Sequence, residues 1–126
     1  MKIYTKKSPN PIGPYSQAIQ TKNLLMISGQ IPIDSISNKI PKKMYDQTFL
    51  VLKNIYEIIK KTNFKLKNIV KTTIFTTNLN KIKTINFAYE TFFKKKISIF
   101  PARSCVEVSK LPKNVQIEIE AIAYKK

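Results

Sequence analysis

Residues 115–124 read Val115-Gln116-Ile117-Glu118-Ile119-Glu120-Ala121-Ile122-Ala123-Tyr124, and most of them alternate between an apolar and a polar side chain. Because successive side chains of a β-strand point to opposite faces of the sheet, this period of two predicts a strand with one apolar face. Glu118 and Glu120 then share the other face, roughly 7 Å apart at the usual strand rise. The stretch therefore predicts a half-buried strand and a pair of carboxylates on its polar side.

A second strand is predicted immediately upstream, over Arg103–Ser109, and residues 111–114 between the two have the composition of a turn. We expect the two strands to form a hairpin, with Arg103, Cys105 and Glu107 on one face of the first. The sequence does not fix the register, so it leaves open which glutamate approaches Arg103. The alternative to a functional site is a cross-strand ion pair on a solvated face, which contributes only ~0.2–1 kcal/mol.

Helix and strand patterns alternate over the rest of the chain. Apolar periodicity and β-branched residues predict strands at Tyr15–Gln20, Leu24–Ser28 and Ile69–Thr77, a helix over 46–62 capped by Asp46, and a helix over 81–95 capped by Asn80. Residues 8–14 contain three prolines and are expected to form a fixed extended loop, and the stretch from residue 29 to Lys43 is expected to be irregular. The prediction is an α+β fold in which two helices pack on one face of a mixed sheet.

The length of 126 residues fits a single domain, residues 1–126, with its own hydrophobic core. One cysteine and no histidine exclude an internal disulfide, the usual Cys/His zinc site and any nucleophilic catalysis that uses an imidazole base. Acid–base chemistry must then come from carboxylates, Tyr, Lys, Cys or water. No apolar core of signal-peptide length and no run near the ~20 residues of a membrane helix is found, so a soluble cytoplasmic protein is expected.

The formal net charge of +16 raises the possibility of a nucleic-acid-binding protein, because lysines that neutralise phosphates supply non-specific affinity. The twenty-two lysines are scattered along the chain, however, and no nucleic-acid-binding motif accompanies them. Together with twenty isoleucines and ten asparagines, they are typical of an A/T-rich coding bias. The sequence favours composition as the source of the charge and leaves contact with nucleic acid as an alternative.

Arg103 is the only arginine in the chain. Its planar guanidinium offers donors in a rigid fork that matches a carboxylate bidentately, whereas a lysine ammonium acts as a flexible point charge. Arg103 is therefore the first candidate for an anion-binding residue, with a structural ion pair as the alternative.

Four segments, in their order and spacing, resemble the RidA family of reactive-intermediate imine deaminases, also called the YjgF/YER057c/UK114 family. They are Gly13-Pro14-Tyr15-Ser16-Gln17, Ser28-Gly29-Gln30-Ile31-Pro32, Phe100-Pro101-Ala102-Arg103-Ser104-Cys105-Val106 and Ile117-Glu118-Ile119-Glu120-Ala121.

The resemblance implies a chorismate-mutase-like fold and a homotrimer with active sites in the clefts between subunits. It also implies hydrolysis of 2-imino acids such as 2-iminobutanoate and 2-iminopropanoate, or of their enamine tautomers, released by pyridoxal-phosphate enzymes, to 2-oxo acids and ammonia. Neither a metal nor an organic cofactor is implied. By motif position, Arg103 would bind the substrate carboxylate, and Glu118 would transfer the proton and orient water. The pocket would be completed by Tyr15, Ser28, Gly29 and Cys105, the last mainly through its backbone.

Two other classes remain open. A nucleic-acid-interacting protein is one, since relatives have been linked to translation inhibition and RNA cleavage. A non-catalytic binder of small carboxylates is the other, with Arg103 holding a metabolite without turnover. No membrane association is expected.

Overall fold

The predicted C-terminal strand forms β6 (Ile117–Tyr124), which is central in the computed structural model of residues 1–126. It pairs antiparallel with β3 (Leu24–Gln30) on one side and with β4 (Ile69–Thr76) on the other. The alternation along β6 divides its side chains as predicted. Ile117, Ile119, Ala121 and Ala123 are buried, whereas Glu120, Ile122 and Tyr124 are exposed on the opposite face.

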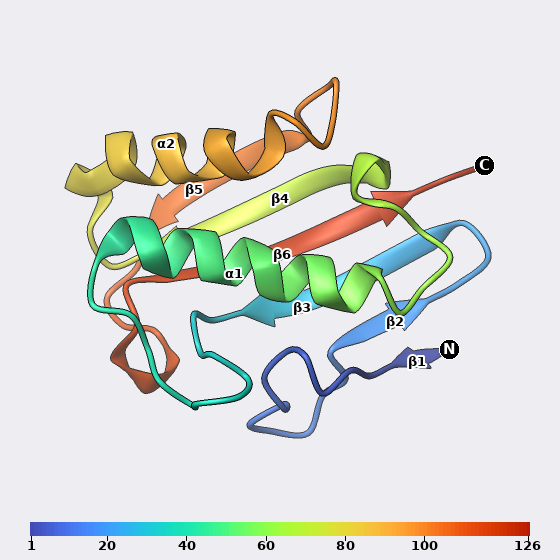
Figure 1. Ribbon diagram of the computed structural model, residues 1–126, viewed down its shortest axis with the longest axis horizontal. Helices are drawn as coiled ribbons and strands as arrows, with labels where there is room; N and C mark the ends of the chain where they lie inside the picture. Colours follow the sequence, from blue (N-terminus) through green and yellow to red (C-terminus); the bar gives the residue numbers. More distant parts are fainter.

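The sheet is mixed and has six strands in the order β1-β2-β3-β6-β4-β5, with β1 at Lys2–Ile3, β2 at Ala18–Gln20 and β5 at Ala102–Glu107. Only β4 and β5 are parallel. Two helices, α1 (Met44–Ile59) and α2 (Ile82–Phe93), run side by side on the same face of this sheet (Figure 1). Short 3-10 helices complete the chain at η1 (Leu66–Asn68), η2 (Leu79–Lys81) and η3 (Pro112–Asn114). The α+β prediction of two helices on one face of a mixed sheet is confirmed.

The predicted hairpin between β5 and β6 is wrong. The two strands run in opposite directions, but β4 lies between them and hydrogen-bonds to both. The physical reason is that a turn-rich connection of several residues reverses the chain equally well whether the returning strand pairs with its predecessor or with the next strand along. Here β4, rich in β-branched residues, lies between β6 and β5, and β5 is left at the edge of the sheet.

The helix starts also differ from the predictions. Lys43, not Asp46, is the N-cap of α1, and no side chain caps that end; Asp46 lies within the first turn, where a carboxylate interacts favourably with the helix dipole. Asn80 is not a cap either: Asn78 accepts from the Asn80 backbone amide at the start of η2, and Lys81 is the N-cap of α2. Most of the predicted strands are shorter in the structure, whereas β3 runs two residues further, to Gln30.

The core fills the space between the helices and the sheet. It is one cluster of 22 buried residues, including Leu52, Ile55 and Ile58 of α1 and Ile85, Phe92 and Phe93 of α2. Three aromatic residues of α2, Tyr89, Phe92 and Phe93, belong to this core, whereas Phe87 on the same helix is 63% exposed. The other face of the sheet carries no helix and leaves Leu24, Met26, Ile122 and Tyr124 more than a third exposed. Neither helix has both the length and the apolar character that crossing a membrane requires.

Ile74 lies in the middle of β4 and is fully buried. We expect Ile74→Ala to lower the free energy of unfolding by about 2–5 kcal/mol, because the substitution removes buried methyl groups and leaves a cavity between rigid elements. Urea unfolding at a fixed chain concentration measures the change. Ile36→Ala is the matched control, since Ile36 is 92% exposed; equal unfolding midpoints for the two variants would contradict this placement of the core.

Candidate functional site

Arg103 lies on β5 with its guanidinium against α2. Its Nη2 donates a hydrogen bond of 2.8 Å to Oδ1 of Asn86, and its Cζ lies 5.1 Å from the centre of the Tyr89 ring. This hydrogen bond is the only one that the guanidinium makes within the chain, so its other N–H donors remain free for a ligand. They face an open depression of about 420 Å³ lined by Asn86, Tyr89, Glu90, Phe100, Pro101 and Arg103.

The Tyr89 ring packs against the Arg103 guanidinium. The ring is 4% exposed, and its hydroxyl shares a 2.8 Å hydrogen bond with Oγ1 of Thr72 on β4. Burial raises the pKa of Tyr89, and the hydrogen bond to Thr72 and the charge of Arg103 oppose that rise only in part. The ring therefore stays neutral and fixed. Cation–π contact with the ring contributes about 0.5–2 kcal/mol and holds the guanidinium against α2.

Glu118 lies half-buried on β6, with its carboxylate against Gly29 of β3. Burial raises the pKa of the Glu118 carboxyl above the usual glutamate value, and the charge of Glu120 raises it further. A carboxyl in this environment holds its proton closer to neutral pH than an exposed glutamate does, which suits an acid–base group.

Ser28 and Gly29 form a β-bulge. Ile27 pairs with Ala121 and Gln30 with Ile119, so two residues of β3 lie opposite Glu120 alone. Ser28 Oγ donates a 2.6 Å hydrogen bond to the carbonyl of Ser16, which ties the bulge to the loop before β2. Bulges re-aim side chains and are common beside active sites.

Tyr15 is 46% exposed and lines a small recess together with Gln17, Gly29, Gln30 and Ile31. The structure thus places Tyr15 and Gly29 along the same recess. The loop that carries Tyr15 is held from inside: Gln17, 1% exposed, accepts from the amide of Thr5 and donates to the carbonyl of Pro9 at 2.9 Å. Residues 8–14 form neither helix nor strand, as expected, and Gln17 hydrogen-bonds to the start of this loop.

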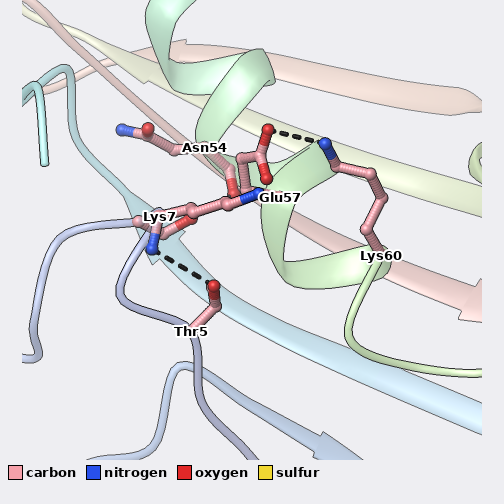
Figure 2. Close-up of polar contacts among 6 residues, drawn as sticks. Thr5, Lys7, Asn54, Glu57 and Lys60 are labelled. Atoms are coloured by element: carbon pink, nitrogen blue, oxygen red, sulfur yellow. Dashed lines mark hydrogen bonds and ion pairs between the residues drawn. The ribbon is translucent and has the colours of Figure 1, made fainter.

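Two neighbouring contacts hold this segment, one to α1 and one within the segment itself. Ser8 Oγ donates to the carbonyl of Asn54 at 2.7 Å, and the Lys7 amide donates to Thr5 Oγ1 at 3.1 Å. Figure 2 shows the second contact beside the ion pair between Lys60 and Glu57, 2.7 Å long, which is the only salt bridge within the chain.

Arg103 therefore has no carboxylate partner in its own chain, and the alternative of a cross-strand ion pair is wrong.

The strand register shows why Arg103 and Glu118 stay apart. Arg103 pairs with Thr72, and Glu118 pairs with Phe75 on the same strand, β4. Paired residues share a face, and positions three apart on a strand point to opposite faces. Arg103 thus lies on the helix-covered side of the sheet and Glu118 on the uncovered side. Within one chain, neither glutamate of β6 approaches Arg103.

Cys105 pairs with the core residue Ile74 and is half-buried on the same face as Arg103. Burial raises the pKa of the Cys105 thiol, against a smaller opposing effect of the Arg103 charge. A neutral thiol is a poor nucleophile, so the structure favours the packing role over a catalytic one for this side chain.

The sequence analysis named neither Asn86 nor Tyr89 as a support for Arg103. The available signal was their spacing of three on α2, which places both on one side of the helix. Nothing in the sequence showed that this side faces Arg103.

Known proteins resemble this chain over nearly its whole length. Residues 5–125 match the family described as Endoribonuclease L-PSP. A RutC family protein, BU371, of Buchnera aphidicola subsp. Acyrthosiphon pisum is 60% identical over 124 residues, which cover 98% of this chain and 97% of that protein. The 2-iminobutanoate/2-iminopropanoate deaminase of Escherichia coli K12 is 44% identical over 124 residues, again 98% and 97% of the two chains.

Among solved structures, E. coli TdcF with bound serine superposes with a TM-score of 0.97 at 40% identity, covering 100% of this chain and 99% of that one. Sequence family, curated relatives and fold agree with one another and with the resemblance found in the four motif segments. The chain belongs to the Endoribonuclease L-PSP family, the YjgF/RidA family, of which the E. coli deaminase is a relative.

Proposed function

We propose that this protein hydrolyses reactive 2-imino acids, among them 2-iminobutanoate and 2-iminopropanoate, to 2-oxo acids and ammonia. The observation that carries the proposal is the environment of Arg103. The only guanidinium of the chain is held against α2 by Asn86 and Tyr89, and its other N–H donors are free beside an open depression. The name of the E. coli relative at 44% identity supports the same activity. We place the protein in the cytoplasm, where pyridoxal-phosphate enzymes would supply the imines.

The active site of this proposal lies between two copies of the chain. Arg103 and Glu118 lie on opposite faces of one sheet, so only a second subunit brings a Glu118 to the Arg103 side. The uncovered face of the sheet favours such assembly, because Leu24 pairs with Tyr124 and Met26 with Ile122 in a contiguous apolar patch. A head-to-tail contact that closes after three copies gives a homotrimer with three equivalent sites.

In the proposed reaction, Arg103 binds the substrate carboxylate through two parallel hydrogen bonds and so fixes the adjacent C=N carbon. Glu118 from the neighbouring subunit supplies a proton to the nitrogen and then accepts one from the attacking water. The water oxygen adds to the C=N carbon and gives a carbinolamine. Glu118 passes the proton taken from the water on to the nitrogen, and the C–N bond breaks as ammonia leaves. The hydroxyl oxygen forms the C=O bond of the 2-oxo acid, and its proton returns to Glu118. Burial raises the pKa of the Glu118 carboxyl, so its protonated form is more available for the first proton transfer than that of an exposed glutamate.

Binding without turnover is the second candidate, because the structurally similar E. coli TdcF holds serine. It uses the same Arg103 and assigns no role to a proton at Glu118. Contact with RNA is a further alternative, supported by the family's description as an endoribonuclease and by the charge of +16.

The deciding experiment couples a threonine dehydratase to this protein and follows 2-oxobutanoate release while semicarbazide captures free imine. We expect faster release of the 2-oxo acid and less captured imine. Arg103→Ala should lower kcat/KM by about 10- to 100-fold, the range for losing charged hydrogen bonds. Lys53→Ala, an equal loss of charge on the exposed side of α1, is the control. No acceleration over a blank, with ligand binding retained, would favour the non-catalytic alternative.

Mixing two inactive variants tests whether the site is shared. Arg103→Ala chains keep Glu118, and Glu118→Gln chains keep Arg103, so co-refolded trimers contain some intact sites. Random 1:1 mixing should restore about a quarter of the wild-type activity if each site takes one residue from each of two neighbours. Mixed chains that stay as inactive as the separate variants would contradict a shared site.

The pH dependence of stability reports on Glu118. Because its pKa is higher in the folded than in the unfolded chain, the wild type should be most stable, relative to Glu118→Gln, below the ordinary glutamate pKa. That advantage should disappear as the pH rises through the raised folded pKa, since the neutral glutamine does not ionise. Thermal unfolding midpoints of both proteins, measured from about pH 4 to about pH 8, test this pH dependence, because that range begins near the ordinary glutamate pKa. A pH-independent difference would mean that Glu118 titrates normally.

A further inference from the structure

Gly29 and Glu118 occupy adjoining space on neighbouring strands. A Cβ atom built on Gly29 would overlap the Oε1 atom of Glu118 and would lie 2.9 Å from Cδ and 3.1 Å from Cγ of the same side chain. The carboxylate therefore fills the place that any side chain at position 29 would take.

The backbone does not require glycine at this position. Neither glycine of the chain has a positive φ, so an L-residue at position 29 meets no conformational strain. All three nearest heavy atoms are those of Glu118. At Gly13, the other glycine, a Cβ would only touch the Tyr15 ring at 3.5 Å, an ordinary contact. Glu118 is thus the group that keeps position 29 free of a side chain.

The bulge gives this contact its geometry. Two residues, Ser28 and Gly29, lie opposite Glu120, which shifts β3 locally against β6. The shift is anchored by Ser28, through its hydrogen bond to Ser16. The backbone of Gly29 is brought against the Glu118 side chain and covers one side of it, and the carboxylate is left half-buried.

We propose that Gly29 is a positioning residue for Glu118. Because Gly29 has no side chain, the Glu118 carboxylate lies against the backbone of the β3 bulge. This contact fixes the position of the oxygen that transfers the proton. The catalytic consequence rests on the proposed function. The position of the carboxylate itself is a property of the unliganded protein and can be measured without any substrate.

The first test titrates Glu118 by NMR in protein with ¹³C-labelled glutamate, in the wild type, Gly29→Ala and Gly13→Ala. In Gly29→Ala the added methyl group displaces the carboxylate towards water, so the pKa of Glu118 should fall towards the usual glutamate value. It should be unchanged in Gly13→Ala. Both variants should fold, because only the end of a flexible side chain has to move in the first. An unchanged Glu118 titration in folded Gly29→Ala would overturn the proposal.

The second test separates displacement of Glu118 from obstruction of the substrate. Shortening the side chain in Glu118→Asp withdraws the carboxylate from position 29. If displacement is the cause, Gly29→Ala should lower kcat by about 10- to 100-fold in the Glu118 background but by less than about threefold in the Asp background. Equal losses in both backgrounds would show that the added methyl group blocks the substrate instead.

Two further outcomes are also decisive. If Gly29→Ala fails to fold while Gly29→Ala combined with Glu118→Asp folds, the steric conflict with Glu118 is supported; if neither folds, glycine is needed for another reason and the proposal is wrong. If the wild type lacks deaminase activity, the proposed function fails, and the NMR titration still decides the role of Gly29.

Discussion

The burial of one face of β6 is the constraint on which the rest of the structure depends. Ile117 and Ile119 are fully buried under the helices, so the alternate residues must face the other side. A slip of one residue would move Glu118 into the core and the isoleucines to the surface, which makes the register strongly determined. The same burial therefore fixes the position of the carboxylate that the proposed chemistry uses.

The helix layer supports the Arg103 guanidinium. Arg103 is on an edge strand, where a long side chain would otherwise be mobile, and α2 supplies both the Asn86 acceptor and the Tyr89 ring. Tyr89 is in turn fixed by Thr72 of β4. Sheet, helix and arginine thus form one connected set of contacts, and an anion reaching Arg103 meets a donor group whose orientation has already been fixed by folding.

The two halves of the candidate site lie on opposite sides of a single sheet, and this explains why a small chain would assemble. A lone subunit exposes an apolar sheet face and keeps Arg103 away from every glutamate of β6. In the proposed trimer, that face would pack against other copies, which would bury the apolar surface and bring the two groups together. Stability and chemistry then favour the same assembly.

By itself, the sequence determined the two α-helices, five of the six strands and the α+β class, because these follow from local periodicity; the two-residue strand β1 was not predicted. It also singled out Arg103 as the only arginine and, through the motif segments, pointed to Glu118 and Gly29. Only the tertiary structure showed that β4 separates β5 from β6, that α2 supports Arg103, and that Glu118 occupies the space left by Gly29. Strand order and contacts between elements depend on which distant surfaces pack together, and local patterns carry no information about that choice.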